Sequence, residues 1–153
     1  MSYNHSAEEI KQKGFLSNAE KNSTLAIWYY AKTEPIPLTL SPAEIILSMY
    51  KYGYLADCND AMAKLYNFKD ADHFIGTPLV ETFPANQENI VLLEKFIENG
   101  YTLVNALSKE RDVNGNTKYF LNSFGGIIEN NHLLGTRGIQ REIRQHEARN
   151  YKN

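Results

Sequence analysis

Cysteine is almost absent from this chain of 153 residues, in which Cys58 stands alone. One cysteine cannot form an internal disulfide, and we therefore expect a protein of the reducing cytoplasm. Long hydrophobic runs are missing too, because the longest, such as NIVLLEKF, are far too short to cross a membrane. The N-terminal residues contain no apolar signal core, which argues against secretion.

An excess of charge of one sign is also missing. The formal net charge is −2, so the sequence predicts no general attraction to nucleic acid or to an anionic membrane. What the chain does have is hydrophobic residues, at 42% of the total, which is enough to bury a core. The length fits one domain.

Motifs for catalysis and metal binding are not found. The sequence has no nucleophile elbow, phosphate-binding glycine loop or HExxH motif, and no pair of histidines has zinc-ligand spacing. It also lacks a phosphoacceptor-histidine signature and an ATP site. We therefore expect that this chain is not an enzyme by itself and holds no metal.

The first half of the chain predicts two strands and two helices. The aromatic and β-branched stretch TLAIWYYAKTEPIPL reads as a strand that ends at two prolines. The stretch SPAE at 41–44 is a helix start, with a capping serine and a proline at the first helical position. Residues 54–57 predict a second strand. Asn59 follows as a hinge and structural cap for a helix over 60–66.

The second half predicts short helices, one longer helix and three strands. Glycine and proline break up residues 69–86, and helix 86–99 follows with its apolar residues on one face. The turn DVNGN joins strands 101–111 and 117–128, and a third strand covers 132–143. Sequential hairpins make neighbours of these strands. The expected fold class is α+β: a five-stranded antiparallel sheet with several short helices and one longer helix on one face.

Three stretches in this order resemble the PAS sensory domain. They are GYLADCNDAMAKLYNF, ADHFIGTPLVETF and the segment from FIENGYTLVNAL to GTRGIQREI. The resemblance covers residues 28–145, which leaves 1–27 as a leader with flanking helices and 146–153 as a linker to an output domain. The EPIPL segment and the helix after it are similar to a bacterial subgroup attached to histidine kinases.

The closing motif of the resemblance is only partly kept. Gly138, Gln140 and Ile143 match it, whereas Glu142 and Arg144 replace the usual Asp and Thr. That Asp and Thr usually join the last strand to the outgoing helix by hydrogen bonds. The resemblance therefore implies Gln140, Glu142 and Ile143 as residues that relay a signal. A tryptophan common in the subgroup is replaced by Arg137.

The resemblance also allows the cofactors of the family to be considered. Its flavin-binding light sensors carry a reactive cysteine where this chain has Leu79, and Cys58 lies in another element. Haem-binding members use a histidine on the long helix, and helix 86–99 has none. His73 reads as a solvated side chain. We identify no cofactor, expect neither flavin nor haem, and leave an unknown small molecule as the ligand.

A cavity between the sheet and the long helix is expected to hold such a ligand. Its predicted lining consists of Tyr66, Ile97, Asn105, Asn122, Phe124 and Gln140. The alternative is that these side chains bond to one another and fill the space. We expect Glu110, Arg111 and Asp112 to be solvated beside an exposed turn. A small α+β isomerase or hydrolase would need a buried acid, and the strands are expected to offer Asn and Ser instead.

The expected function is that of a sensory domain of a bacterial signalling protein, as part of a two-component histidine kinase. It would bind a small ligand or a partner and act as a homodimer with a downstream kinase or other output domain. The alternative is a PAS-type dimerisation or protein-interaction module of a transcription regulator or a stand-alone protein. The basic residues of the C-terminal tail alternate with glutamates, which is more typical of a solvated linker than of a DNA-binding stripe.

Overall fold

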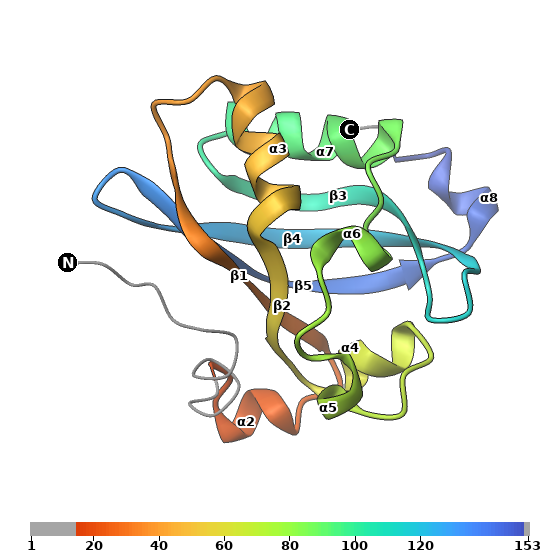
Figure 1. Cartoon of the computed structure of the whole chain (residues 1–153). Coiled ribbons are helices and arrows are strands. Elements are labelled where there is room, and N and C mark those ends of the chain that lie inside the picture. The colour runs from red at the N-terminus through yellow and green to blue at the C-terminus, as the bar shows by residue number, and fades with distance from the viewer. Residues whose placement is uncertain (1–14, 152–153) are drawn as a thin grey trace.

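Five antiparallel strands form one sheet in the spatial order β2-β1-β5-β4-β3 (Figure 1). The computed structural model describes residues 15–151, so half of the expected leader, residues 1–14, lies outside the described residues. The strands are β1 (Ala26–Pro37), β2 (Gly53–Cys58), β3 (Thr102–Arg111), β4 (Thr117–Glu129) and β5 (His132–Ile143). The sheet confirms the predicted α+β fold class.

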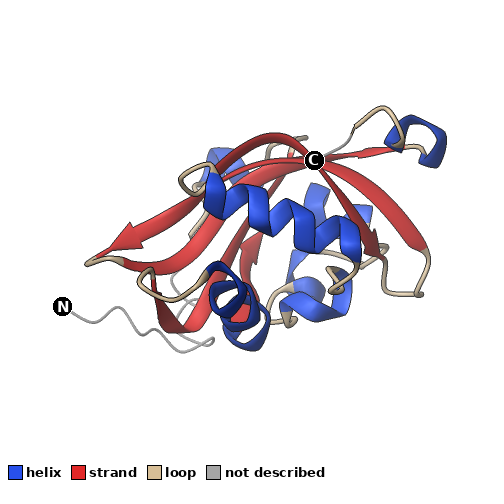
Figure 2. Cartoon of the chain, turned by 90° about the horizontal axis from the view of Figure 1, so that it is seen from above, coloured by secondary structure: helices blue, strands red, loops and turns tan. Residues whose placement is uncertain are grey.

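Several short helices and two longer ones, α3 and α7, complete the fold. They are α2 (Asn18–Lys21), α3 (Pro42–Tyr52), α4 (Asp60–Leu65), α5 (Ala71–Phe74), α6 (Leu79–Thr82), α7 (Gln87–Glu98) and α8 (Gln145–Ala148). Seen from above, the sheet curves around the helices that connect β1 to β3 (Figure 2). The result is a cup, with the sheet as its wall and the helices as its cover.

The last strand lies in the centre of the sheet. β5 pairs with β4 through the hairpin that joins them, and on its other side it pairs with β1, so that Trp28 is opposite Gly138. A Cβ atom at position 138 would lie 2.4 Å from the Cβ of Phe124. Gly138 therefore permits the large aromatic side chains of the neighbouring strands to pack across β5.

Local sequence explains where the helices begin. Ser41 accepts a hydrogen bond from the backbone N–H of Glu44 at the start of α3. Asn86 accepts one from Asn89 at the start of α7, and the Asn59 side chain accepts one from Met62 at the start of α4. These caps satisfy N–H groups that the first helical turn leaves without partners.

Two segments cover the outer face of the sheet, residues 15–21 at one end and α8 at the other. Asp57 of β2 accepts hydrogen bonds from the backbone N–H groups of Phe15 and Leu16, at 2.6 and 2.9 Å, and forms an ion pair with Lys21 at 2.6 Å. Arg137 of β5 forms an ion pair with Glu20 and holds the pKa of that carboxyl near 2. Residues 15–21 are thereby fastened to two strands.

At the other end, α8 packs on the outer face beside the end of β5. Ala148 shares a buried hydrophobic cluster with Ile143 of β5, Leu107 of β3 and Leu121 of β4. The end of the strand in the middle of the sheet thus shares a hydrophobic cluster with the last described helix, which also packs against β4. None of the helices among residues 15–151 is long and apolar enough to span a membrane.

Candidate ligand cavity

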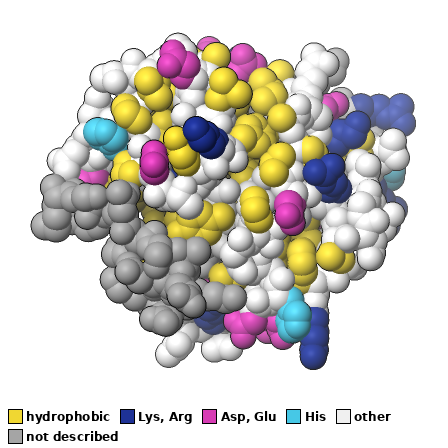
Figure 3. All heavy atoms as spheres, viewed as in Figure 1, with side chains coloured by type: hydrophobic (Ala, Val, Ile, Leu, Met, Phe, Trp, Pro, Cys, Tyr) yellow, Lys and Arg dark blue, Asp and Glu magenta, His cyan; other side chains and the backbone are white. Residues whose placement is uncertain are grey.

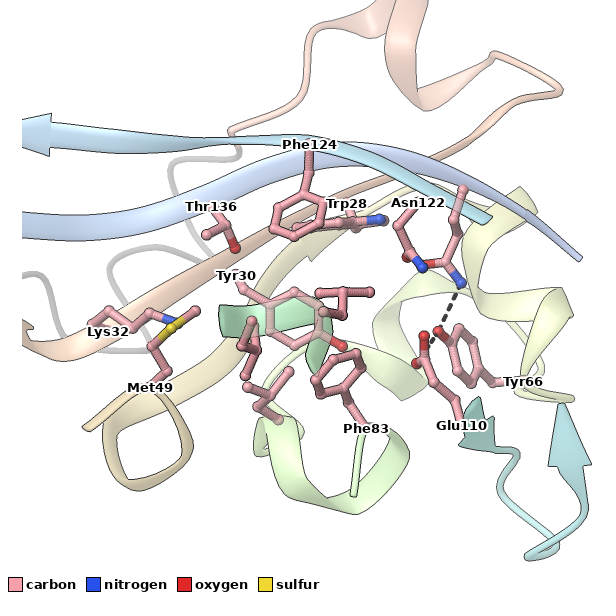
Figure 4. A pocket seen from close by; sticks show the side chains of 14 residues that line it. Trp28, Tyr30, Lys32, Met49, Tyr66, Phe83, Glu110, Asn122, Phe124 and Thr136 are labelled. Carbon is pink, nitrogen blue, oxygen red and sulfur yellow. Dashed lines mark hydrogen bonds between the residues drawn. The ribbon is translucent and has the colours of Figure 1, made fainter. Parts of the chain in front are cut away.

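A small cavity lies inside the cup, between the sheet and its helical cover (Figure 4). Its volume is about 40 Å³. Fourteen side chains line it: Trp28, Tyr30, Lys32, Met49, Tyr66, Leu79, Phe83, Leu92, Leu93, Glu110, Asn122, Phe124, Thr136 and Gln140. By this measure of volume about 10–15 Å³ is enough to hold one water molecule, so the space has room for a few waters or for a molecule of very few atoms.

Strand alternation places most of these side chains. Trp28, Tyr30 and Lys32 lie two residues apart on β1 and all face the cavity, whereas Ile27, Tyr29 and Ala31 belong to a cluster on the outer face. Successive side chains of a strand point to opposite faces of a sheet. Because β3, β4 and β5 follow the same rule, the polar lining side chains of four strands meet in one space.

A chain of hydrogen bonds runs along one end of the cavity and reaches the last strand. The Tyr66 hydroxyl donates to a carboxylate oxygen of Glu110 at 2.6 Å and accepts from the side-chain amide of Gln140 at 2.7 Å. Tyr66 follows α4, Glu110 lies on β3 and Gln140 lies on β5. The network therefore connects three elements that are far apart in the sequence.

The second carboxylate oxygen of Glu110 is also engaged. It accepts a hydrogen bond from the Ser108 hydroxyl at 2.6 Å, and Ser108 accepts one in turn from the side-chain amide of Asn122 at 2.8 Å. The same amide donates to the backbone carbonyl of Ala106 at 3.1 Å. Buried polar groups are thus joined in one connected network, which fixes their orientations.

The expectation that Glu110 and Asp112 are solvated is wrong. Each side chain is only 4% exposed. Burial raises the pKa of Glu110 to about 7, partly offset by its hydrogen bonds with Ser108 and Tyr66. Asp112 closes the β3–β4 turn by accepting hydrogen bonds from the backbone N–H groups of Asn114 and Asn116. A buried acid therefore exists in the cavity, contrary to the sequence analysis.

A buried lysine lies at the opposite end of the cavity from Glu110 (Figure 4). Lys32 is 5% exposed, and its ammonium group has no hydrogen-bond or ion-pair partner among residues 15–151. Burial away from water lowers its pKa to about 8. The indole N–H of Trp28, in the same lining, is also buried without a hydrogen-bond partner in the described part of the chain.

Four of the six predicted lining residues are brought together here: Tyr66, Asn122, Phe124 and Gln140. Ile97 and Asn105 are not. Ile97 is half-buried against the core and does not reach the cavity. The β3–β4 register shifts between Leu103 and Ala106, and Asn105 takes a positive φ of 52° there with its side chain exposed. The bulge breaks the alternation on which the prediction for Asn105 depended.

The predicted relay residues occupy three different settings. Gln140 is in the cavity wall, and Ile143 is buried against α8 on the outer face. Glu142 is exposed and lies 3.4 Å from the ammonium group of Lys118 on β4. The side chains of Gln140 and Ile143, three residues apart on β5, thus lie on opposite faces of the sheet.

The predicted cap and the lone cysteine belong to the core. The Asn59 side chain, besides capping α4, donates to the backbone carbonyls of Glu20 and Leu25, at 3.0 and 2.7 Å. It thus joins the N-terminal segment to the β2–α4 joint. Cys58 is fully buried and does not line the cavity, and burial raises its pKa to about 12. A thiol in that state is a poor nucleophile.

Lys32, Glu110, Trp28 and Tyr30 line the cavity but were missed by the sequence analysis. The signal for them is present, since Trp28, Tyr30 and Lys32 alternate along one strand and Glu110 follows Ser108 by two. Glu110 was expected to be solvated, which is the usual state of a glutamate, and no prediction was made for Lys32.

The cavity is smaller than the sites that hold cofactors in other proteins. Sites for cofactors and drug-sized ligands have volumes of about 300–1,000 Å³, well above the 40 Å³ found here. Four aromatic side chains, of Trp28, Tyr30, Phe83 and Phe124, belong to the lining of the cavity. Leu79, at the position of the reactive cysteine in the flavin-binding sensors, lines the cavity with an apolar side chain. Among the described residues no cluster of three or more His, Cys, Asp or Glu is arranged to hold a metal.

Comparison with known proteins identifies the fold. No family model matches the chain, and no curated protein sequence matches it. The solved PAS domain of a protein from Colwellia psychrerythraea aligns with a TM-score of 0.57 and 20% identity, over 82% of this chain and 91% of that one. A light-oxygen-voltage domain studied with a flavin analogue gives 0.57 at 9% identity, over 82% of both chains.

A third similar structure is the light-oxygen-voltage protein of Rhodobacter sphaeroides. It aligns with a TM-score of 0.55 and 10% identity, over 92% of this chain and 69% of that one. At these identities the similarity concerns the path of the backbone and the order of the elements. The five-stranded cup described above is therefore a PAS fold.

Proposed function

We propose that this chain is a sensory domain that binds a small ligand in its cavity and passes the change on through β5. The observation that carries the proposal is the position of Gln140. Its side chain is in the cavity wall, held at 2.7 Å by the Tyr66 hydroxyl, and its backbone belongs to the central strand of the sheet. A ligand that competes for this hydrogen bond acts directly on the strand that leads out of the domain.

The outward path has a physical connection. Ile143 at the end of β5 belongs to the same hydrophobic cluster as Ala148 of α8, so a shift of β5 would change the surface on which the last described helix packs. A ligand moves such an equilibrium only by binding one arrangement better than the other. The two arrangements we propose differ in whether Gln140 bonds to Tyr66 or to the ligand.

The setting of the domain is also part of the proposal. The sequence resemblance to the histidine-kinase-associated subgroup supports a cytoplasmic two-component sensor kinase, in which the segment after α8 leads to the kinase or another output. In Figure 3, lysine and arginine side chains gather on the side where Figure 1 shows α8. They fit a solvated connection to a further domain.

A homodimer is proposed with residues 1–27 at or near its interface, as their predicted flanking helices suggest. The test is light scattering of the full chain and of a variant that lacks residues 1–14. Removal of these residues leaves the contacts of Asp57 with Phe15, Leu16 and Lys21 in place. A dimeric mass for the full chain is expected, and a monomeric mass for both proteins would contradict the proposal.

Glu110 makes the enzymatic alternative worth comparing with the sensory one. It provides the buried acid that an isomerase or hydrolase would need. Both of its carboxylate oxygens already accept hydrogen bonds, from Tyr66 and Ser108, and the network continues to β5. This arrangement supports a role in positioning Gln140 more than a role as a free general base. We therefore propose no reaction for this chain.

The experiment that tests ligand binding is native mass spectrometry of the freshly purified protein, with an absorption spectrum. A copurified small molecule that is lost on denaturation supports the proposal. Visible absorption typical of haem or flavin would contradict the cofactor assignment. A protein with no bound mass that also shows no response to any added small molecule would contradict ligand sensing, and would favour the alternative of a dimerisation or protein-interaction module.

A further inference from the structure

The lining of the cavity indicates which class of molecule would bind there. This inference rests on the proposed function. We propose that the ligand is a very small carboxylate, of the size of formate or acetate, bound with its carboxylate on Lys32 and its apolar end toward Leu92, Leu93 and Phe124. The arrangement of charge, donors and apolar wall around the cavity supports this assignment.

The first observation is an unpartnered cation. The ammonium group of Lys32 lies in the cavity lining, the side chain is 95% buried, and no carboxylate of residues 15–151 forms an ion pair with it. A buried charge without a partner is unfavourable, and a bound anion would correct this. Glu110 does not do so, because it lies at the other end of the cavity and its oxygens bond to Tyr66 and Ser108.

The second observation is the room made for this ammonium group. A Cβ atom at position 53 would lie 3.1 Å from the Lys32 Nζ and 2.4 Å from the Met49 carbonyl oxygen. Glycine at position 53 therefore avoids a clash with the Met49 carbonyl oxygen and allows the Lys32 head group to lie close to the backbone of β2. The Thr136 hydroxyl lines the same part of the cavity, and Figure 4 shows Thr136 on the same side as Lys32. It can donate a second hydrogen bond to an anion there.

The rest of the lining limits the anion in kind and in size. Met49, Leu79, Phe83, Leu92, Leu93 and Phe124 make most of the wall apolar. An apolar wall favours an organic anion with a hydrocarbon end over a strongly hydrated inorganic ion. The volume of 40 Å³ leaves no space for a long tail. These limits point to the shortest carboxylates.

The single tryptophan provides the readout, since Trp28 lines the cavity. Sodium formate, acetate, butyrate and chloride are titrated at about pH 6.5 and constant ionic strength, where Lys32 is charged. We expect a saturable change in tryptophan fluorescence with formate or acetate, weaker binding of butyrate and no saturable change with chloride.

Two variants locate the site. Lys32→Met keeps the length of the side chain without its charge, and we expect binding of acetate to weaken by about tenfold or more, as for loss of a charge-assisted hydrogen bond. Lys64→Met makes the same change at an exposed position of α4 and is expected to bind as the natural chain does. Circular dichroism checks that each variant is folded.

The outcomes separate this inference from the proposed function. No saturable response to any carboxylate, or an equal loss in both variants, would overturn the inference. If native mass spectrometry then finds a bound molecule of another class, the sensory proposal stands without the carboxylate. If acetate binds through Lys32 but the hydrogen exchange of β5 and α8 does not change on binding, the site is real and the proposed relay is wrong.

Discussion

Lys32 is the basic side chain of the cavity lining, and Glu110 is its acidic side chain. Both are about 95% buried, and they lie at opposite ends of the space. Burial lowers the pKa of Lys32 to about 8 and raises the pKa of Glu110 to about 7, so both pKa values lie close to neutral pH. Each residue therefore makes folding less favourable in its charged form, and the two effects have different pH windows.

Lys32→Met should stabilise the protein at neutral pH. The pKa of Lys32 falls from 10.5 to about 8 on folding, so the charged form destabilises the folded state fully below about pH 8. This effect fades as the pH rises from about 8 to 10.5. We expect the variant to gain on the order of 2–3 kcal/mol in the free energy of unfolding at about pH 7.

Urea unfolding of the natural chain, Lys32→Met and the exposed control Lys64→Met measures this gain. The difference should shrink in buffers of about pH 10, where lysine is losing its proton in the unfolded chain as well. A variant that is less stable than the natural chain at neutral pH would show that the Lys32 ammonium group has a partner within the fold.

Glu110→Gln should remove a pH dependence of the opposite kind. The pKa of Glu110 rises from 4.5 to about 7 on folding, so the stability of the natural chain falls as the pH rises through this window. Relative to the variant, we expect a loss on the order of 2 kcal/mol between about pH 5 and pH 8. Thermal or urea unfolding across this range measures it, with Glu94→Gln on the exposed face of α7 as control. Parallel stability curves for the natural chain and Glu110→Gln would contradict the burial of this charge.

A glycine in β5 offers a test of the packing. Gly138→Ala places a methyl group 2.4 Å from the Phe124 Cβ and 2.5 Å from the Ser123 carbonyl oxygen. Either the backbone of the two strands or the Phe124 side chain must therefore move. We expect a loss of about 1–3 kcal/mol in the free energy of unfolding, as for other overpacked sites. Gly125→Ala is the matched control, because the nearest atom to its new methyl group is 3.9 Å away. Equal effects of the two substitutions would refute the close approach at Gly138.

At the scale of elements, the sequence predicts the strands and main helices well because their signals are local. Alternating apolar residues, the Ser41 and Asn59 caps and the DVNGN turn each act within a few residues of the chain. The features that could not be predicted depend on distant partners or on broken alternation. The Arg137–Glu20 ion pair joins residues 117 positions apart, and the bulge before Ala106 turns Asn105 outward.

The site was predicted only in part for the same reason. Tyr66, Asn122, Phe124 and Gln140 could be placed from the strand order and the family resemblance, because their side chains are aromatic or amide groups suited to a cavity wall. The burial of Lys32 and Glu110 was not predicted. Strand alternation places Lys32 on the same face as Trp28 and Tyr30, but charged residues are rarely buried, and alternation does not show which face is enclosed. The sequence predicts a cavity, but only the folded sheet shows that two charged side chains line it.

The attachment of residues 15–21 to the sheet can be tested at Asp57. Asp57→Asn removes the charge that pairs with Lys21 and weakens the bonds from the N–H groups of Phe15 and Leu16. We expect a loss of about 2–4 kcal/mol in stability, since one charge of a partly buried pair is left alone. Hydrogen exchange at residues 15–21 should become faster as well. Asp72→Asn, an exposed position on α5, is the control, and equal stability of the two variants would contradict the anchoring role.

On the scale of the whole molecule, one central strand of the cup runs from the wall of the cavity to the last described helix. β5 pairs with β1 and β4, has Gln140 in the cavity wall and ends at Ile143 against α8. Residues 15–21 and α8 cover the two ends of the outer face. Arg137 of β5 also holds residues 15–21 through its ion pair with Glu20. If β5 acts as the proposed relay, we expect a change in its position to reach both terminal segments.

The most direct test of this account is hydrogen–deuterium exchange of Tyr66→Phe, which removes only the hydroxyl that joins Gln140 to Glu110. The account predicts faster exchange along β5 around Gln140 and onward to α8. Tyr50→Phe, which removes the hydroxyl bonded to the Pro84 carbonyl at 3.3 Å, should leave those segments unchanged. Identical exchange of β5 and α8 in the natural chain and in Tyr66→Phe would contradict the coupling of the cavity to the outgoing strand.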